Sequence, residues 1–223
     1  MPLKGDGMFD LTLTFDNGPE PEITPKVLLE LEKRDILATF FVIGEKLRQN
    51  RPLVDQAHAA GHWIGNHTWT HGIPLGDRAE GEGAIAEIAE TQAELGILTH
   101  QDKFFRPFSN GKIGPRLLNA EATALLQDKG YTCVLWNAVP EEWLDPEGWV
   151  ARAFDQCLER PWTLMVLHDL PTGAMDQLAR FLDRVAEAGG RFRQDFPPDC
   201  VPIHRGTATT ALSPYVSGGW PQG

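Results

Sequence analysis

The stretch "LTLTFDNGPEPEITPK", residues 11–26, decides the fold and locates the first polar cluster. Apolar residues at 11, 13 and 15 alternate with polar residues at 12, 14 and 16, which predicts a β-strand with Asp16 opposite the apolar face. On this alternation alone, Asn17 would point away from Asp16. We expect Gly18-Pro19 to turn the chain at once, since Gly reaches unusual dihedrals and Pro cannot continue a ladder. The Asp16 and Asn17 side chains could then converge at the end of the strand.

The length and charge of the chain limit its class and partners. Its 223 residues, 42% of them hydrophobic, can bury one large core. Twenty Lys plus Arg against 31 Asp plus Glu give a net charge of -11, which repels nucleic acid and anionic membranes. We expect neither as a partner. Because no apolar run is long enough to span a bilayer and no secretory signal pattern precedes the first strand, we expect a cytoplasmic protein.

The three cysteines, Cys133, Cys157 and Cys200, are far apart and lack a paired metal spacing. We expect buried, reduced thiols without a functional role. The oligomeric state stays open, a homo-oligomer included.

Short apolar runs alternate with segments that have helical spacing. Strands are expected at "DLTLTF" from 10, "ATFFVIG" from 38, "HWIGNH" from 62, "KFFRPF" from 103, "YTCVLWN" from 131, "TLMVLH" from 163 and "CVPI" near 200, and helices over 24–34, 46–60, 78–96, 115–129, 147–159 and 174–188. Gly61, Gly130 and Gly189 are placed as helix stops. Six repeats predict an α/β fold with a parallel sheet closed into a barrel.

The alternation fades after about residue 204. We therefore expect one barrel domain over 1–204 and a C-terminal tail over 205–223. The tail, "RGTATTALSPYVSGGWPQG" from 205, is rich in Gly, Ser, Thr and Pro. This composition fits a segment that packs on the surface, pairs with a neighbour or stays mobile.

Polar side chains follow five of the expected strands, at the rim where barrels of this kind carry their sites. They are Asp16 with Asn17, His67 with His71, Arg106, the segment "WNAVPEEW" from 136, and His168 with Asp169. On a helical turn, the i, i+4 spacing of His67 and His71 would bring two imidazoles to one divalent ion. Each residue also has a purely structural interpretation: exposed histidines, a turn-forming Asp16, an ion-paired Arg106 and a core His168.

Taken together, these segments resemble the polysaccharide deacetylase family, the carbohydrate esterases that share the NodB homology domain. The similarity runs from about residue 10 to 190, and "TFDNGPEPEITPKVL", "ATFFVIG" and "GHWIGNHTWTH" match the family pattern in order and spacing. The resemblance implies a distorted (β/α) barrel with about seven parallel strands. It also implies metal-dependent hydrolysis of an acyl group, usually the N-acetyl of an amino sugar.

The resemblance assigns roles to ten residues. It implies that Asp16 is the general base, His168 the acid that protonates the leaving amine, and Arg106 the residue that orients the base. Asn17, His67 and His71 would hold the metal. Substrate would contact Phe108, whose backbone N–H would face the oxyanion, and the apolar side chains of Trp143, Leu164 and Val166. The implied ion is Zn²⁺, with Co²⁺, Ni²⁺ or Mn²⁺ as alternatives.

The chain departs from the family pattern in three places. Asn17 stands where the family has an aspartate, so the ion would lose one negative charge and some affinity. Val139 replaces the aspartate that tethers the acid, with Glu142 in the second acidic position, so we expect the pKa of His168 to fall. The segment "RPFSNG" from 106 differs from the family's Arg-Pro-Pro-aromatic-Gly.

The sequence thus predicts a metal-dependent hydrolase that removes an acyl group from a carbohydrate or related amide by attack of a metal-bound water. One alternative is a catalytically silent member of the family that binds carbohydrate or protein. Another is a hydrolase of a different C–N bond, in a ureide or a formamide.

Overall fold

The computed structural model describes residues 8–221. The first seven residues of the predicted barrel domain and the last two of the predicted tail lie outside this range. Within this range the chain forms two compact units, one comprising residues 8–40, 52–63 and 136–197, the other residues 41–51, 64–135 and 198–221. β2 (Thr39–Val42), α3 (Arg51–Ala59) and β3 (Trp63–Asn66) have residues in both units.

The centre of the first unit is β1 (Asp10–Asp16), the strand predicted from the opening stretch. It pairs in parallel with β6 (Trp162–His168) along its whole length and with β7 (Arg191–Arg193) at its start. β1 is buried on both faces. The polar face therefore bonds to protein groups instead of water: Thr14 Oγ1 donates to the Met165 carbonyl at 2.7 Å and Thr12 Oγ1 to that of Asp195 at 2.7 Å.

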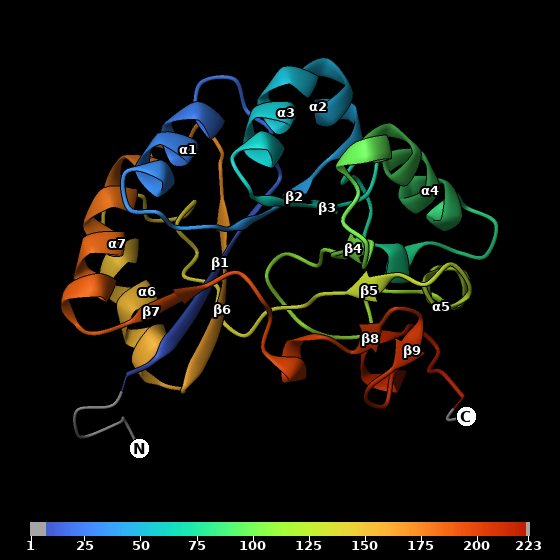
Figure 1. Cartoon of the computed structure of the whole chain (residues 1–223). Coiled ribbons are helices and arrows are strands. Elements are labelled where there is room, and N and C mark those ends of the chain that lie inside the picture. Colours follow the sequence, from blue (N-terminus) through green and yellow to red (C-terminus); the bar gives the residue numbers. More distant parts are fainter. Residues whose placement is uncertain (1–7, 222–223) are drawn as a thin grey trace. The chain divides into compact units, whose positions relative to one another are not determined.

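Three helices lie entirely in the first unit: α1 (Thr24–Glu32), α6 (Trp149–Leu158) and α7 (Leu178–Glu187), the last preceded by the 3₁₀ turn η3 (Ala174–Gln177). α6 and α7 lie side by side (Figure 1). Trp149 of α6 is buried against Phe181 of α7, with 5.2 Å between the ring centroids. This apolar contact fixes the two helices that flank β6 in the sequence.

The second unit contains a short sheet that is only partly parallel. β3 pairs in parallel with β4 (Phe104–Phe105), and β4 with β5 (Thr132–Cys133). β8 (Ile203–His204) runs antiparallel to β5, and β9 (Thr207–Ala208) antiparallel to β8. The prediction of a final parallel strand at "CVPI" is therefore wrong, because Pro198–Cys200 forms the 3₁₀ turn η4 and the chain enters the sheet from the opposite direction.

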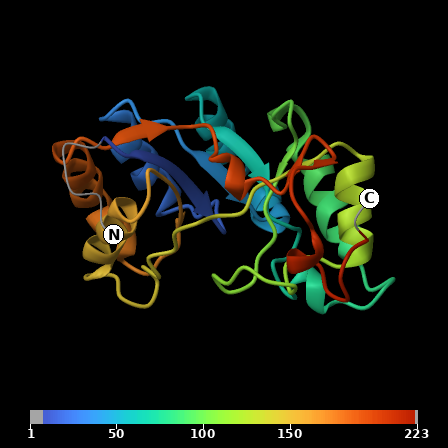
Figure 2. The same ribbon diagram turned by 90° about the horizontal axis from the view of Figure 1, so that it is seen from below.

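The helices of the second unit are α2 (Gly44–Gln49), α4 (Ala84–Leu95) and α5 (Ala120–Asp128), with 3₁₀ turns η1 (Leu75–Asp77), η2 (Gly96–Leu98) and η5 (Ser213–Tyr215). The tail packs on this unit. Leu118 and Val216 form a β-bridge, and the N–H of Gly206 donates to the Tyr131 carbonyl at 2.8 Å. Figure 2 shows the tail, in red, beside the segment that carries α5.

Candidate active site

Asp16 and His168 end two neighbouring strands of the first unit. They are register partners at the last positions of β1 and β6. Because register partners on parallel strands face the same side, both side chains leave the sheet together. Asp16 is buried and His168 is half-buried. The structure thus brings together the two residues to which the resemblance assigns the roles of base and acid.

The turn after β1 begins at Asn17, and not at Gly18 as the sequence predicted. Asn17 has a φ of 75°, a left-handed conformation that Asn tolerates better than most residues. Its side-chain Oδ1 is buried and has no hydrogen-bond partner within residues 8–221. A buried acceptor without a donor has a desolvation cost that a bound cation or ligand donor would remove.

Gly18 fits this turn because it has no side chain. A Cβ at position 18 would lie 2.3 Å from Oδ2 of Asp169. The buried Asp169 carboxylate accepts a hydrogen bond from the Thr24 hydroxyl, which in turn accepts the N–H of Glu20 at 2.7 Å. The loop from Asn17 to Thr24 is therefore packed and hydrogen-bonded against Asp169.

The imidazole of His168 has a carboxylate partner, which corrects our expectation from Val139. Oε1 of Glu142 lies 2.7 Å from Nδ1 of His168 and also accepts the backbone N–H of His168 at 2.8 Å. Glu142 is 1% exposed, so this contact is shielded from water. The second acidic position of the segment supplies the tether that position 139 lacks.

The pKa of His168 is raised, where the sequence predicted a fall. Burial is the largest single influence and lowers the pKa. The hydrogen bond to Glu142 and the negative charges of Glu142, Asp16 and Asp169 together outweigh it. The imidazole therefore keeps its proton to a higher pH than a free histidine does, which suits a proton donor.

His67 and His71 lie together in the second unit. Their ring centroids are 4.9 Å apart and the rings are inclined by 45°. The segment that carries them is a tight loop after β3, and not the helical turn that the i, i+4 spacing suggested. Nδ1 of His67 lies 2.8 Å from the Arg106 carbonyl. Because a carbonyl can only accept, this contact places the ring proton on Nδ1 and the lone pair on Nε2.

Arg106 and Phe108 border the two imidazoles. Phe108 stacks on His71 with 3.8 Å between the centroids. Arg106 is fully buried, and its Nε and Nη2 donate to the Val134 and Leu135 carbonyls, each at 3.1 Å. The guanidinium therefore also ties the segment after β4 to the segment after β5. Its predicted role of orienting the base stays a prediction.

The three predicted apolar contacts with substrate lie in the first unit. Trp143 is half-buried and meets the His168 ring edge-on at 4.8 Å between the centroids. Leu164 and Val166 are buried within β6. Their contact with an acyl group stays a prediction, as does that of Phe108. Sequence reasoning missed Glu142 as the partner of the acid, because Glu142 lies in an irregular segment where strand periodicity gives no side-chain direction.

Each residue predicted to hold the divalent ion has a donor of the type that such an ion binds. Asn17 offers a buried oxygen without a donor, and His67 offers Nε2 beside the ring of His71. Imidazole nitrogens with one oxygen suit Zn²⁺ and its neighbours in the first transition row. Within residues 8–221 no group of three or more His, Cys, Asp or Glu side chains is placed to bind a metal, so the predicted set depends on the neutral amide. The convergence of these donors stays a prediction.

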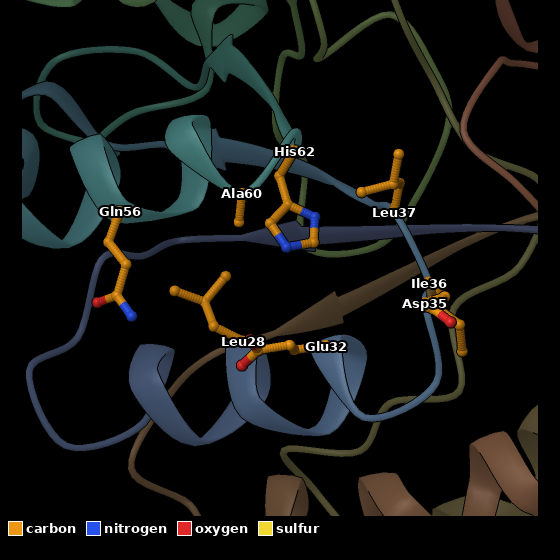
Figure 3. Close-up of a pocket in the computed structure, with 8 residues that line it drawn as sticks. All are labelled: Leu28, Glu32, Asp35, Ile36, Leu37, Gln56, Ala60 and His62. Atoms are coloured by element: carbon orange, nitrogen blue, oxygen red, sulfur yellow. The ribbon is translucent and has the colours of Figure 1, made fainter.

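A separate pocket lies in the first unit, between α1, the segment before β2, and α3. Its volume is about 550 Å³. Figure 3 shows the residues that line it: Leu28, Glu32, Asp35, Ile36, Leu37, Gln56, Ala60 and His62. The lining segments precede β2 and β3, whereas the predicted site residues follow strands. The pocket is therefore not part of the candidate active site.

The family model described as polysaccharide deacetylase matches residues 6–134. A chitooligosaccharide deacetylase from Azorhizobium caulinodans is 33% identical over 165 residues, which cover 70% of this chain and 72% of that protein. A peptidoglycan-N-acetylglucosamine deacetylase from Bacillus cereus is 29% identical over 192 residues, covering 82% and 84%.

Solved structures show the same fold. A family 4 carbohydrate esterase from Streptomyces lividans, in complex with acetate, has a TM-score of 0.70 at 26% identity and covers 87% of this chain and 96% of that one. A peptidoglycan N-acetylglucosamine deacetylase has a TM-score of 0.72 at 23% identity, covering 90% and 92%. A pseudoenzyme of the same esterase family, from Bacillus anthracis, has a TM-score of 0.69 at 20% identity, covering 84% and 64%.

These likenesses confirm the predicted fold class, the distorted (β/α) barrel. They define the class of protein as a hydrolase that acts on carbon–nitrogen bonds other than peptide bonds. The chain belongs to the polysaccharide deacetylase family. Within residues 8–221 there is no helix with the length and apolar character that a membrane span requires.

Proposed function

We propose that the chain is a metal-dependent deacetylase that removes the N-acetyl group from an amino sugar in an oligosaccharide or polysaccharide. One observation carries this proposal: Asp16 and His168 end adjacent strands, and Glu142 lies behind the imidazole. This arrangement pairs a carboxylate that can accept a proton with an imidazolium that can donate one. Amide hydrolysis needs both, because the amine leaves poorly without a proton.

The carboxylate of Asp16 accepts the proton of the attacking water. His168 then delivers its proton to the amide nitrogen as the carbon–nitrogen bond breaks. Glu142 holds Nδ1 of His168, so that Nε2 carries the transferable proton. Arg106 orients the base, the Phe108 backbone N–H faces the oxyanion, and the side chains of Trp143, Leu164 and Val166 form the apolar wall for the acetyl methyl group.

Asn17, His67 and His71 would hold a divalent ion, with Zn²⁺ favoured over Co²⁺, Ni²⁺ and Mn²⁺. When bound, such an ion lowers the pKa of water and polarises the acyl carbonyl. The buried, unpartnered Oδ1 of Asn17 supports its place in this set. The substrate class is supported by the named relatives, which are deacetylases of chitooligosaccharides and of peptidoglycan.

A catalytically silent carbohydrate-binding role is the second candidate. Asn17 favours it, because a neutral amide binds an ion more weakly than a carboxylate does. A deacetylase and a silent carbohydrate-binding protein would use the same site, but only the deacetylase would release acetate. A single assay of acetate release therefore separates the two functions.

The test measures acetate released from N-acetylated chitooligosaccharides and from peptidoglycan fragments, with formamido sugars and ureides as further substrates. Asp16→Asn should abolish release, and Glu22→Gln should retain it, since Glu22 is exposed on the following loop. Equal signals from the wild type and Asp16→Asn would end the enzymatic proposal. Protein purified without chelator should contain a divalent metal, and less than about a tenth of an equivalent would argue against the metal site.

A further inference from the structure

The loop that carries His67 and His71 has an unfavourable backbone. Thr68 has a φ of 69° and His71 a φ of 55°, both in the left-handed region that residues other than glycine seldom adopt. Such conformations persist only where the surrounding structure holds them in place. The relation of the two imidazoles therefore depends on contacts made by the residues between them.

Glu87 of α4 makes these contacts. Its Oε2 accepts the backbone N–H groups of Trp69 and Thr70, each at 2.8 Å. Its Oε1 accepts the Thr70 hydroxyl at 2.7 Å and Nη2 of Arg78 at 2.8 Å. Glu87 is 7% exposed, so a buried carboxylate binds the middle of the loop through three donors and pairs with Arg78 through the fourth.

The next residue of α4 holds the start of the same loop. The Ile88 carbonyl accepts the side-chain amide of Asn66 at 2.8 Å, and Oδ1 of Asn66 accepts the N–H of Thr68 at 3.0 Å. Adjacent residues of one helix thus fix the loop on both sides of Thr68. The backbone between His67 and His71 is therefore held by hydrogen bonds to α4.

We propose that Glu87 is the positioning residue that sets the two imidazoles for a shared cation. This inference rests on the proposed function, because it assumes that His67 and His71 bind the ion. A carboxylate is required at position 87, since each of its oxygens accepts two donors. Glutamine has the same shape but only one side-chain oxygen. Its amide nitrogen cannot accept a hydrogen bond, so two of the four donors around position 87 would lose their acceptor.

The experiment compares Glu87→Gln with Glu90→Gln, the same change at an exposed position of α4. The first measurement is the affinity of the metal-free protein for Zn²⁺ and Co²⁺ by calorimetric titration. Glu87→Gln should weaken binding by about tenfold or more, the usual effect of removing a group that orients metal ligands, and Glu90→Gln should not change it.

The second measurement is independent of metal. Amide hydrogen exchange of the metal-free protein should speed up at Trp69 and Thr70 in Glu87→Gln, while the core strand β1 keeps its protection. If Glu87→Gln does not fold, Thr70→Val removes one of the four donors from an exposed side chain and should produce a smaller change in the same direction.

The outcomes separate this inference from the proposed function. If the wild type binds the ion and Glu87→Gln binds it equally well, the positioning role is overturned. Unchanged exchange at Trp69 and Thr70 in Glu87→Gln overturns it as well. A wild type that binds neither Zn²⁺ nor Co²⁺ instead contradicts the metal site of the proposed function.

Discussion

Glu142 helps to raise the pKa of His168, through a hydrogen bond and through its charge, although Glu142 lies outside any helix or strand. Position 142 belongs to an irregular segment in which Glu141 has a φ of 54°. The period of two that predicts the direction of side chains in a strand does not extend into such a segment. The pairing of Glu142 with His168 could therefore not be derived from the sequence, whereas the strand-end positions of Asp16 and His168 could.

Glu142→Gln should lower the pKa of His168, because the substitution removes the carboxylate hydrogen bond and one of the three negative charges that together outweigh burial. The proposed acid is active when protonated, so deacetylation should be lost at a lower pH in the variant than in the wild type. The measurement is the pH profile of kcat/KM. Glu141→Gln, the exposed neighbour, is the matched control and should keep the wild-type profile. An unchanged alkaline limb in Glu142→Gln would show that His168 does not supply the proton.

Asn17→Asp should tighten Zn²⁺ binding, because it places a negative charge where the structure has a buried, unpartnered amide oxygen. Competition titration with a chromophoric chelator measures the change. Asn17→Ala should weaken binding in the same assay. No gain in affinity for Asn17→Asp would mean that this side chain does not reach the ion.

Among the elements, the sequence identifies those with clear periodicity or clear stops. The strand predicted from the alternation over 10–16 is present as β1. The predicted helix stops all have positive φ: Gly61, Gly130 and Gly189. β7 was missed because Arg191–Arg193 is only three residues long and contains a single apolar residue, too few to show a period. Its arginines bind the Asp10 carboxylate of the adjacent strand, at 2.7 Å for Arg191.

Helix boundaries were predicted less well than helix existence. The helix expected over 46–60 is divided at Asn50 into α2 and α3, which the following Pro52 could have signalled. α5 begins at Ala120 and not at 115, because the side chain of Asn119 caps it by accepting the N–H of Ala122 at 2.9 Å. The conformation of the loop that carries His67 and His71 could not be predicted, because it depends on hydrogen bonds to α4 that no local sequence pattern indicates.

Gly18→Ala should destabilise the segment between β1 and α1. A Cβ would lie 2.3 Å from the buried Asp169 carboxylate, which is held by Thr24. Overpacking of this kind costs about 1–3 kcal/mol. Chemical denaturation measures the loss, and Gly114→Ala, where a Cβ meets nothing within 4 Å, should be close to neutral. Equal stability of the two variants would show that the contact with Asp169 relaxes freely.

At the scale of the whole molecule, His62 should make the free energy of unfolding depend on pH. It is buried, its Nδ1 accepts the Ala38 N–H at 3.1 Å, and burial lowers its pKa from 6.5 to about 4. Between those values the unfolded chain takes up a proton that the folded chain does not. The contribution is therefore complete above pH 6.5 and is lost as the pH falls toward 4, by roughly 3 kcal/mol.

Urea denaturation from pH 7 to pH 4 measures this dependence. His62→Gln should have a lower free energy of unfolding at pH 7 but a shallower decline on acidification. His58→Gln, an exposed change on α3, should follow the wild type. A decline in His62→Gln as steep as that of the wild type would assign the acid sensitivity to other groups.

The burial of all three thiols has a practical consequence for every measurement above. Cys133, Cys157 and Cys200 form no disulfide and are buried. Burial raises the pKa of Cys133 and Cys157 to about 12, so the reactive thiolate of these two residues is scarce at neutral pH. The native protein should resist alkylation by maleimides and stay monomeric on non-reducing gels after storage in air. A cysteine introduced at the exposed position 90 would then be the single attachment point for a fluorophore or spin label.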